Sequence, residues 1–282
     1  MRKQLFLSLL AWGMLFLVLL WVLFPIFWVV VSSLRSANTL TNFDIDLKNL
    51  TVMNYKDLFS KTSFLVWLKN TMLLSGGAAL LTVVLSGAIG YAFSRFKFPG
   101  RKWGLLAGIL AQMFPVCMAM VALFQVLLVV GQLTKGGMGL NSIPTLILIY
   151  AGGGVPFSAW LIKGYLDTIP KDMEESAYLD GATPWQAYRL IILPLLCPML
   201  AVIFLLNFLV PYNEFLLPSV VLTGMEKYTL SVGMRSFVSG QFATNWTLLA
   251  AASVLGAIPV LVLFLCLQRF LVEGLTKGAI KG

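Results

Sequence analysis

Long apolar runs dominate the chain and are separated by short polar segments. Six of these runs reach about twenty residues or more, the length that a helix needs to cross roughly 30 Å of hydrocarbon. The pattern therefore predicts an all-α integral membrane protein with six transmembrane helices. The expected spans are residues 10–32, 71–93, 103–130, 143–162, 195–222 and 247–271, and the third of them is expected to be broken by Pro115.

The composition excludes a soluble enzyme. The chain is 59% hydrophobic and 11% charged, whereas soluble domains carry about 25% charged residues. Its net charge of +9 is expected to come from basic residues beside the spans, not from nucleic-acid binding. There is no histidine, and Cys117, Cys197 and Cys266 have no CxxC spacing. We therefore predict no metal site, no cofactor site and no catalytic residue in this chain.

The orientation follows from the basic residues. The loop 95–102 has four basic residues and no acid, which places it in the cytoplasm. With six spans, both termini and the segment 163–194 lie on the same side. The apolar stretch 5–31 is too long for a signal peptide, so we expect a retained first helix. The expected parts are 1–70 (first helix and extracytoplasmic segment), 71–272 (five-helix core) and 273–282 (cytoplasmic tail).

The segment 167–194 predicts a helix–turn–helix on the cytoplasmic side. Pro170 can open the first helix, and acids follow in its first turn, where the helix dipole favours them. Gly181 stands where a left-handed C-terminal cap is expected. Thr183 to Gln186 then predicts a capping box with proline at the first helical position, opening a second short helix from Pro184 to about Ile192. Such a projection either packs on its own membrane domain or docks into a partner.

Part of this segment resembles the EAA motif of ATP-binding-cassette importer permeases. The matching residues are Glu175-Ser-Ala177, then Gly181, then Ile191-x-Leu193-Pro194. Ser176 departs from the usual alanine but is also small. The resemblance implies a six-helix type I importer permease (MetI-like) fold in which the helix–turn–helix is a coupling loop that docks into an ATPase subunit. The implied coupling residues are Glu174, Glu175, Ser176, Ala177, Asp180, Gly181 and Trp185.

Further segments resemble the maltose/maltodextrin (MalG-like) carbohydrate permeases, and the likeness covers nearly the whole chain. These segments are residues 91–100, 180–187, 228–234, 268–271 and 274–282. The resemblance implies that the tail, with Lys277 and Lys281, contacts the ATPase subunits. It also implies that an outer loop holding Ser239, Gly240 and Gln241 contacts the binding protein.

Asn213 and Glu214 lie in the expected fifth span. An acid near a membrane interior indicates a functional site by default. Glu214 could equally make local hydrogen bonds near the outer end of the span. The sequence leaves open whether this pair has a structural role or lines the translocation path.

The chain has no GxxxxGK[ST] motif and hence no phosphate-binding loop of its own. Its energy source must lie in a partner, which would bind ATP and Mg²⁺. The resemblance implies a bacterial inner-membrane complex with a MalF-like second permease, two MalK-like ATPase subunits and an extracytoplasmic sugar-binding protein. The implied function is ATP-driven import of maltodextrin-type oligosaccharides.

Three alternatives remain. The first is an importer permease of the same class for another oligosaccharide or for glycerol phosphate. The second is half of a secondary transporter, although such proteins keep acids or histidines at mid-membrane and this chain offers at most Glu214. The third is a membrane scaffold that only recruits a partner, for which spans broken by glycine and proline have no purpose.

Overall fold

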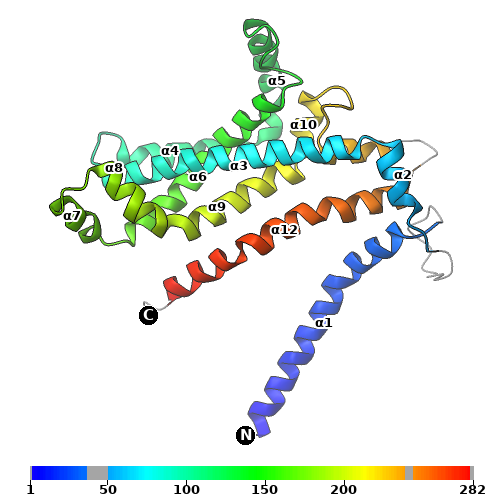
Figure 1. Ribbon diagram of the computed structural model, residues 1–282, viewed down its shortest axis with the longest axis horizontal. Helices are drawn as coiled ribbons and strands as arrows, with labels where there is room; N and C mark the ends of the chain where they lie inside the picture. Colours follow the sequence, from blue (N-terminus) through cyan, green and yellow to red (C-terminus); the bar gives the residue numbers. More distant parts are fainter. Residues whose placement is uncertain (1, 37–49, 239–243, 280–282) are drawn as a thin grey trace. The chain divides into compact units, whose positions relative to one another are not determined.

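The computed structural model describes residues 2–36, 50–238 and 244–279, and within them it consists of helices and connecting loops without a named strand (Figure 1). The chain divides into two compact units, one of Met1–Leu65 with Gly233–Pro259 and the other of Val66–Val232 with Val260–Gly282. Among the described residues, five helices are long and apolar enough to cross a membrane. They are Leu7–Ser33, Phe64–Arg95, Ile143–Asp167, Pro184–Asn213 and Trp246–Phe270.

The smaller unit begins with α1 (Arg2–Ser33), which contains Pro25. The end of α1 is joined to α2 (Met53–Lys61) by hydrogen bonds: the hydroxyl groups of Ser33 and Tyr55 lie 2.7 Å apart, and Asn54 donates to the Ser33 carbonyl at 2.9 Å. Most of α1 keeps its apolar side chains exposed, up to 82% for Trp21. A helix that is apolar on every side and exposed in this way is suited to lipid or to another membrane subunit.

The larger unit is a bundle built on α3 (Phe64–Arg95), α6 (Ile143–Asp167) and α9 (Leu193–Asn213). Small residues let α3 and α6 approach closely, because a Cβ at Gly90 would meet the Ile162 side chain at 2.6 Å. One buried cluster joins these three helices near the end of α6. Its members are Tyr91, Ile162, Leu166, Ile192, Leu196 and Ile203.

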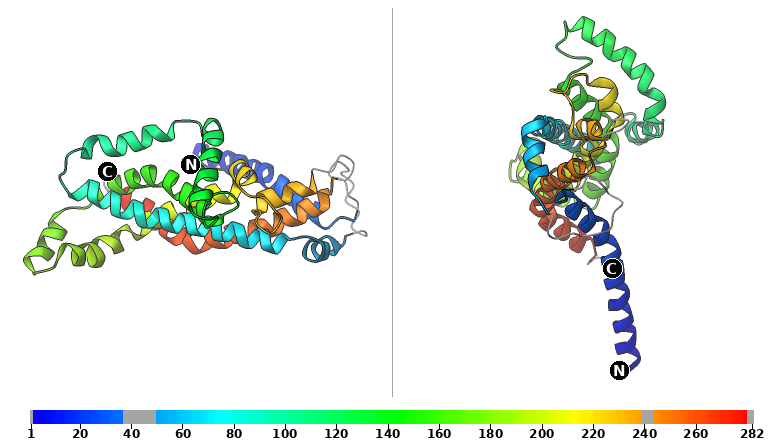
Figure 2. Two further views of the ribbon diagram at one scale, coloured as in Figure 1. Left: turned by 90° about the horizontal axis from the view of Figure 1, so that it is seen from above. Right: turned by 90° about the vertical axis from the view of Figure 1, so that its right-hand side faces the viewer.

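The expected third span, residues 103–130, is broken at Pro115, as the sequence predicted. The structure has α4 (Arg101–Gln112) and α5 (Val116–Leu133), and the chain turns between them (Figure 2). Pro115 causes the break, because it lacks an amide donor and disfavours helical geometry at Phe114. The apolar part of α5, Met118–Leu133, is shorter than the five long helices.

The expected fifth span, residues 195–222, is also wrong in its bounds. Its helix begins earlier, because α8 (Pro184–Ala187) continues through a π-helical turn, η2 (Tyr188–Ile192), into α9. It ends at Asn213, where Glu214 adopts an extended backbone with ψ 133°. After this break come short elements and a long last helix. They are α10 (Leu216–Val221), α11 (Leu230–Met234), η3 (Arg235–Phe237) and α12 (Trp246–Ala279).

Candidate functional site

The first arm of the predicted helix–turn–helix is α7 (Asp172–Leu179), with Asp172, Glu174 and Glu175 in its first turn. It begins two residues after Pro170. Gly181 ends the arm with φ +85°, which confirms the left-handed cap. The Ala182 amide donates to the Ala177 carbonyl at 2.9 Å. A side chain at this φ would be strained, so Gly181 fixes the angle between the two arms.

The second arm starts with the predicted capping box. The Thr183 amide donates to Gln186 Oε1 at 2.7 Å, and the Gln186 amide donates to Thr183 Oγ1 at 3.3 Å. However, the expected separate helix ending near Ile192 is wrong. The π turn accommodates Pro194 without a break, because its wider register shifts the hydrogen bonds that a proline cannot make. The second arm and the membrane span are therefore one unbroken helix, Pro184–Asn213.

A buried ion pair joins the first arm to α3. Arg95 Nε lies 2.5 Å from Glu174 Oε1, and the two side chains are only 7% and 5% exposed. The Tyr91 hydroxyl donates to Glu174 Oε2 at 2.9 Å, and Arg95 Nη2 donates to the Ile169 carbonyl at 3.2 Å. Buried charges are tolerated when they are paired and hydrogen-bonded, as both are here. This Tyr91–Arg95–Glu174 network fixes α7 to the end of α3.

Further contacts join the ends of α3, α4 and α6. Ser94 donates to Asp167 Oδ1 at 2.7 Å, and Lys163 Nζ lies 2.5 Å from Asp167 Oδ2. Arg101 Nε and Nη2 donate to the carbonyls of Phe93 and Ser94 at 2.6 and 2.8 Å. Side chains from three helices therefore hold the ends of α3, α4 and α6 together. We call these joined ends the platform, and α7 is attached to it.

Aromatic rings hold the second arm on α3. The ring centroid of Tyr188 lies 4.7 Å from that of Tyr91 and 5.7 Å from that of Trp185. Tyr188 is half-buried, whereas Trp185 is 66% exposed. Trp185 thus reaches outward from a row of three tilted rings whose other end, Tyr91, is buried in the bundle.

The candidate coupling residues divide by exposure. Glu174 faces inward, Ala177 is half-buried, and the remaining five are exposed: Glu175, Ser176, Asp180, Gly181 and Trp185. Leu179, at the tip of α7, is 90% exposed. It was missed from the sequence, although an apolar residue at the end of an acidic helix is a possible signal of a partner pocket. We call the exposed residues Glu175, Leu179, Asp180 and Trp185 the tip face.

Asn213 and Glu214 stand where α9 ends. Asn213 is exposed and donates to the Leu209 carbonyl of its own helix at 2.9 Å, while Glu214 accepts a hydrogen bond from the Leu216 amide at 2.8 Å. Glu214 also lines a cavity of about 900 Å³ among α4, α6, α9 and α10, together with Gln112, Tyr150 and Asn207. Glu214 therefore has a local structural contact and also lies on the cavity wall.

Comparison with known proteins decides the family. A family model described as "Binding-protein-dependent transport system inner membrane component" matches residues 83–277. The chain belongs to this family. It is an inner-membrane permease subunit of a transporter that works with a partner permease, an ATPase and a binding protein.

Individual relatives extend the match over nearly the full length. The maltose/maltodextrin transport system permease protein MalG of Vibrio parahaemolyticus is 39% identical over 274 residues, covering 93% of this permease and 91% of the relative. In Bacillus subtilis, the maltodextrin permease protein MdxG is 36% identical over 262 residues, and the galactooligosaccharide permease protein GanQ is 38% identical over 267. Both cover 93% of this permease and 91% of their own length.

A crystal structure shares the fold. It is a bacterial ABC transporter that imports the acidic polysaccharide alginate, with a TM-score of 0.79, 20% identity, and coverage of 96% of this permease and 98% of that chain. The likeness supports the MetI-like permease fold expected from the sequence. Ser239, Gly240, Gln241 and Lys281 lie outside the described residues, and Lys277 lies in the last turns of α12, where only the backbone is described.

Proposed function

We propose that this chain is one of two permease subunits in an ATP-driven importer of maltodextrin-type oligosaccharides. In this proposal the helix–turn–helix docks into an ATPase subunit, and the chain itself hydrolyses nothing. The observation that carries the proposal is the unbroken helix Pro184–Asn213, which begins beside the docking tip and ends at the large cavity. A displacement of the tip would therefore move a wall of that cavity.

The tip face supports docking into a partner. Glu175 supplies a charge that can pair with a basic group and fix the register of the interface. Leu179 and Trp185 supply apolar area, and aromatic side chains are frequent anchors of interfaces. Glu174, in contrast, is satisfied inside the subunit by Arg95 and Tyr91. We therefore assign Glu174 to positioning the first arm and Glu175 to meeting the ATPase.

The substrate class follows from the relatives. MalG and MdxG are named for maltose and maltodextrin, and the chain resembles both along nearly its whole length. GanQ, named for galactooligosaccharides, is about equally similar, so galactooligosaccharides are the second candidate. The remaining alternative is a secondary transporter, which would need an acid at mid-membrane for ion coupling. Glu214 suits this role poorly, because it stands at the end of α9 and accepts a hydrogen bond from the Leu216 amide.

The large cavity is the proposed half of the translocation path. Its volume of about 900 Å³ falls within the range of roughly 300–1,000 Å³ typical of ligand sites. Gln112, Tyr150, Asn207 and Glu214 supply polar groups in a mostly apolar wall. The companion permease would close the other side.

We further propose that the tip face, both termini and the Lys277–Lys281 region lie in the cytoplasm, with Ser239, Gly240 and Gln241 facing the binding protein outside. The basic loop 95–102 supports this orientation. Its test is a Leu179→Cys variant in a chain freed of its native cysteines. A membrane-impermeant maleimide should label this cysteine in inside-out vesicles and not in right-side-out vesicles.

The deciding experiment is reconstitution with the companion permease, the ATPase and the binding protein. Uptake of maltodextrin should require ATP, and Glu175→Gln and Gly181→Ala should lower uptake while assembly persists. Faster uptake of galactooligosaccharides than of maltodextrin would instead support galactooligosaccharides as the substrate class. Uptake that follows a proton or sodium gradient and ignores both substitutions would refute the importer proposal.

A further inference from the structure

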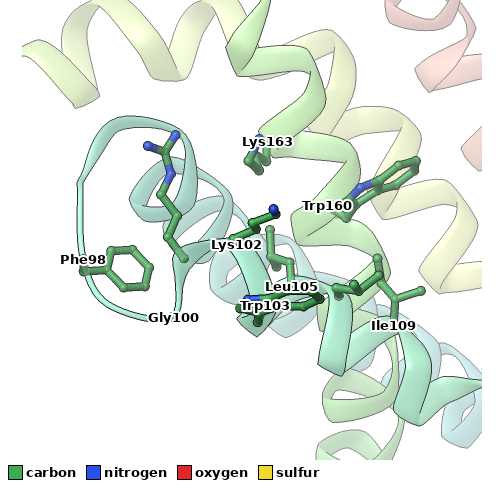
Figure 3. Close-up of a pocket in the computed structure, with 10 residues that line it drawn as sticks. Phe98, Gly100, Lys102, Trp103, Leu105, Ile109, Trp160 and Lys163 are labelled. Atoms are coloured by element: carbon green, nitrogen blue, oxygen red, sulfur yellow. The ribbon is translucent and has the colours of Figure 1, made fainter.

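A second cavity, of about 680 Å³, lies between the start of α4 and the last turns of α6 (Figure 3). Three cationic residues line it: Arg101 and Lys102 of α4, and Lys163 of α6. The other lining residues that matter here are Trp103, Ile109 and Trp160. No acidic residue is among the residues that line it. Neither the proposed translocation path nor the tip face includes any of the residues that line it.

The cavity is graded from charged to apolar. Along α4 the order is Arg101, Lys102, Trp103, then two leucines, then Ile109, which lies about 12 Å from the helix start at 1.5 Å per residue. Along α6 the order is mirrored, because Lys163 stands one turn before the helix end and Trp160 lies about one turn deeper. Both walls therefore place their cations at one end and only uncharged residues at the other.

The charged end lies at the ends of two of the long apolar helices, α3 and α6, and beside the start of α4. α3 ends at Arg95, α4 begins at Arg101 and α6 ends at Asp167, and hydrogen bonds join these three ends. Tryptophan is enriched at the level where the hydrocarbon meets the headgroups, and Trp103, which is 65% exposed, directly follows Lys102 at this end. The cavity therefore opens at the depth of the lipid headgroups.

The charge at this end is positive. Arg101 donates only to backbone carbonyls, and Lys102 lies 5.5 Å from the Trp103 ring without a carboxylate partner among the described residues. Lys163 is paired with Asp167, whose other oxygen accepts from Ser94. Three cations thus lie near one carboxylate, that of Asp167. The N-terminus of α4 adds partial positive charge at the same place, because its N-cap residue, Gly100, has no side chain to cap the helix.

We propose that this cavity binds one anionic phospholipid. Its phosphate lies between Lys102 and Lys163, and an acyl chain follows α4 past Leu106 towards Ile109. A free phosphate ion would use the cations but leave the apolar wall empty, so the gradient favours the lipid. Binding of a lipid would brace the α3–α4–α6 platform that carries α7. The proposal rests on this cavity alone and not on the sugar or on ATP.

The test uses the assembled complex in phosphatidylcholine vesicles that contain a trace of photoactivatable phosphatidylglycerol. Cross-linked peptides are mapped by mass spectrometry, and unlabelled phosphatidylglycerol, phosphatidylcholine and inorganic phosphate are compared as competitors. We expect cross-links in residues 101–109 and 160–163, which phosphatidylglycerol displaces and the other two do not. Displacement by phosphate would make the site one for a soluble anion, and equal displacement by phosphatidylcholine would show no headgroup selection. Either result would overturn the proposal.

Matched variants separate the site from general charge. Lys102→Gln with Lys163→Gln should lower cross-linking about tenfold or more, since each lysine near the headgroups contributes several-fold. Lys97→Gln with Lys171→Gln removes the same charge from exposed positions outside the cavity and should leave it unchanged. Lys102→Arg with Lys163→Arg keeps both charges and should retain the signal, which would assign the loss in the glutamine variant to the missing charge. Equal loss in the first two variants, or cross-links only to the companion permease, would refute the assignment.

Discussion

The buried pair of Arg95 and Glu174 offers the sharpest test of how the helix–turn–helix is attached to the bundle. Removing one partner of such a pair leaves an uncompensated buried charge and typically costs about 3–5 kcal/mol. In Glu174→Leu, Arg95 keeps its bond to the Ile169 carbonyl, so the cost should lie near the lower figure. Arg95→Met leaves the carboxylate of Glu174 with only the Tyr91 hydroxyl and should cost about as much or more.

The double variant Arg95→Met/Glu174→Leu separates stability from coupling. Replacing a buried pair by apolar residues of similar size is often neutral or stabilising, so the double variant should unfold close to the wild-type midpoint. It lacks the directional link between α3 and α7, however. We expect uptake per ATP hydrolysed to fall about tenfold, which is within the usual range of coupling energies between sites.

The assay is denaturant unfolding of the purified subunit together with uptake and ATP hydrolysis by the reconstituted complex. As a control, Asp57→Leu/Lys61→Met removes an exposed pair one helical turn apart, whose contribution should be about 0.5 kcal/mol or less. Single variants as stable as the wild type would contradict the burial of the pair. A double variant with wild-type uptake per ATP would show that the pair only stabilises the fold and does not couple it.

Three further predictions address the turn, the bundle and the tip. Gly181→Ala forces a side chain at φ +85°; it should cost about 1–2 kcal/mol, seen as reduced uptake with intact assembly. Gly90→Ala places a Cβ 2.6 Å from Ile162 and should lower the free energy of unfolding by about 1–3 kcal/mol, whereas Gly76→Ala meets open space in the subunit and should not lower it. Leu179→Asp should reduce co-purification of the ATPase about tenfold if the tip enters an apolar pocket; unchanged recovery would exclude Leu179 from that interface.

Local signals in the sequence predicted local structure well. Hydropathy located the cores of the long helices, the box of Thr183 and Gln186 was found as expected, and Gly181 has the left-handed backbone that the pattern required. Each of these features depends on residues within a few positions of one another. The error at Glu214 arises because hydropathy averages over a window and passes across a single residue that ends a helix. The break at Pro115 is visible in the sequence because the proline itself marks it.

The inward orientation of Glu174 could not be predicted in the same way. Glu174 and Glu175 are adjacent acids in the same first turn, and both suit the helix dipole equally well. What distinguishes them is Arg95, which is distant in the sequence and meets Glu174 only after α3, α6 and α7 are assembled. The sequence offered one weak signal, namely an arginine with no acid in its own loop.

The continuity of the Pro184–Asn213 helix relates the two ends of the subunit. Its 30 residues span about 45 Å at 1.5 Å per residue, so one element reaches from Trp185 on the tip face to Asn207 and Glu214 at the large cavity. The π turn near its start is the place where such a helix yields most easily, and Tyr188 in that turn is held against Tyr91. A force on the tip face would therefore either shift the whole helix or bend it at Tyr188, and the ring contact with Tyr91 favours the shift. Because Asn207 is itself joined to Ser158 of α6 by a 3.0 Å hydrogen bond, α6 would follow, and two walls of the cavity would move together.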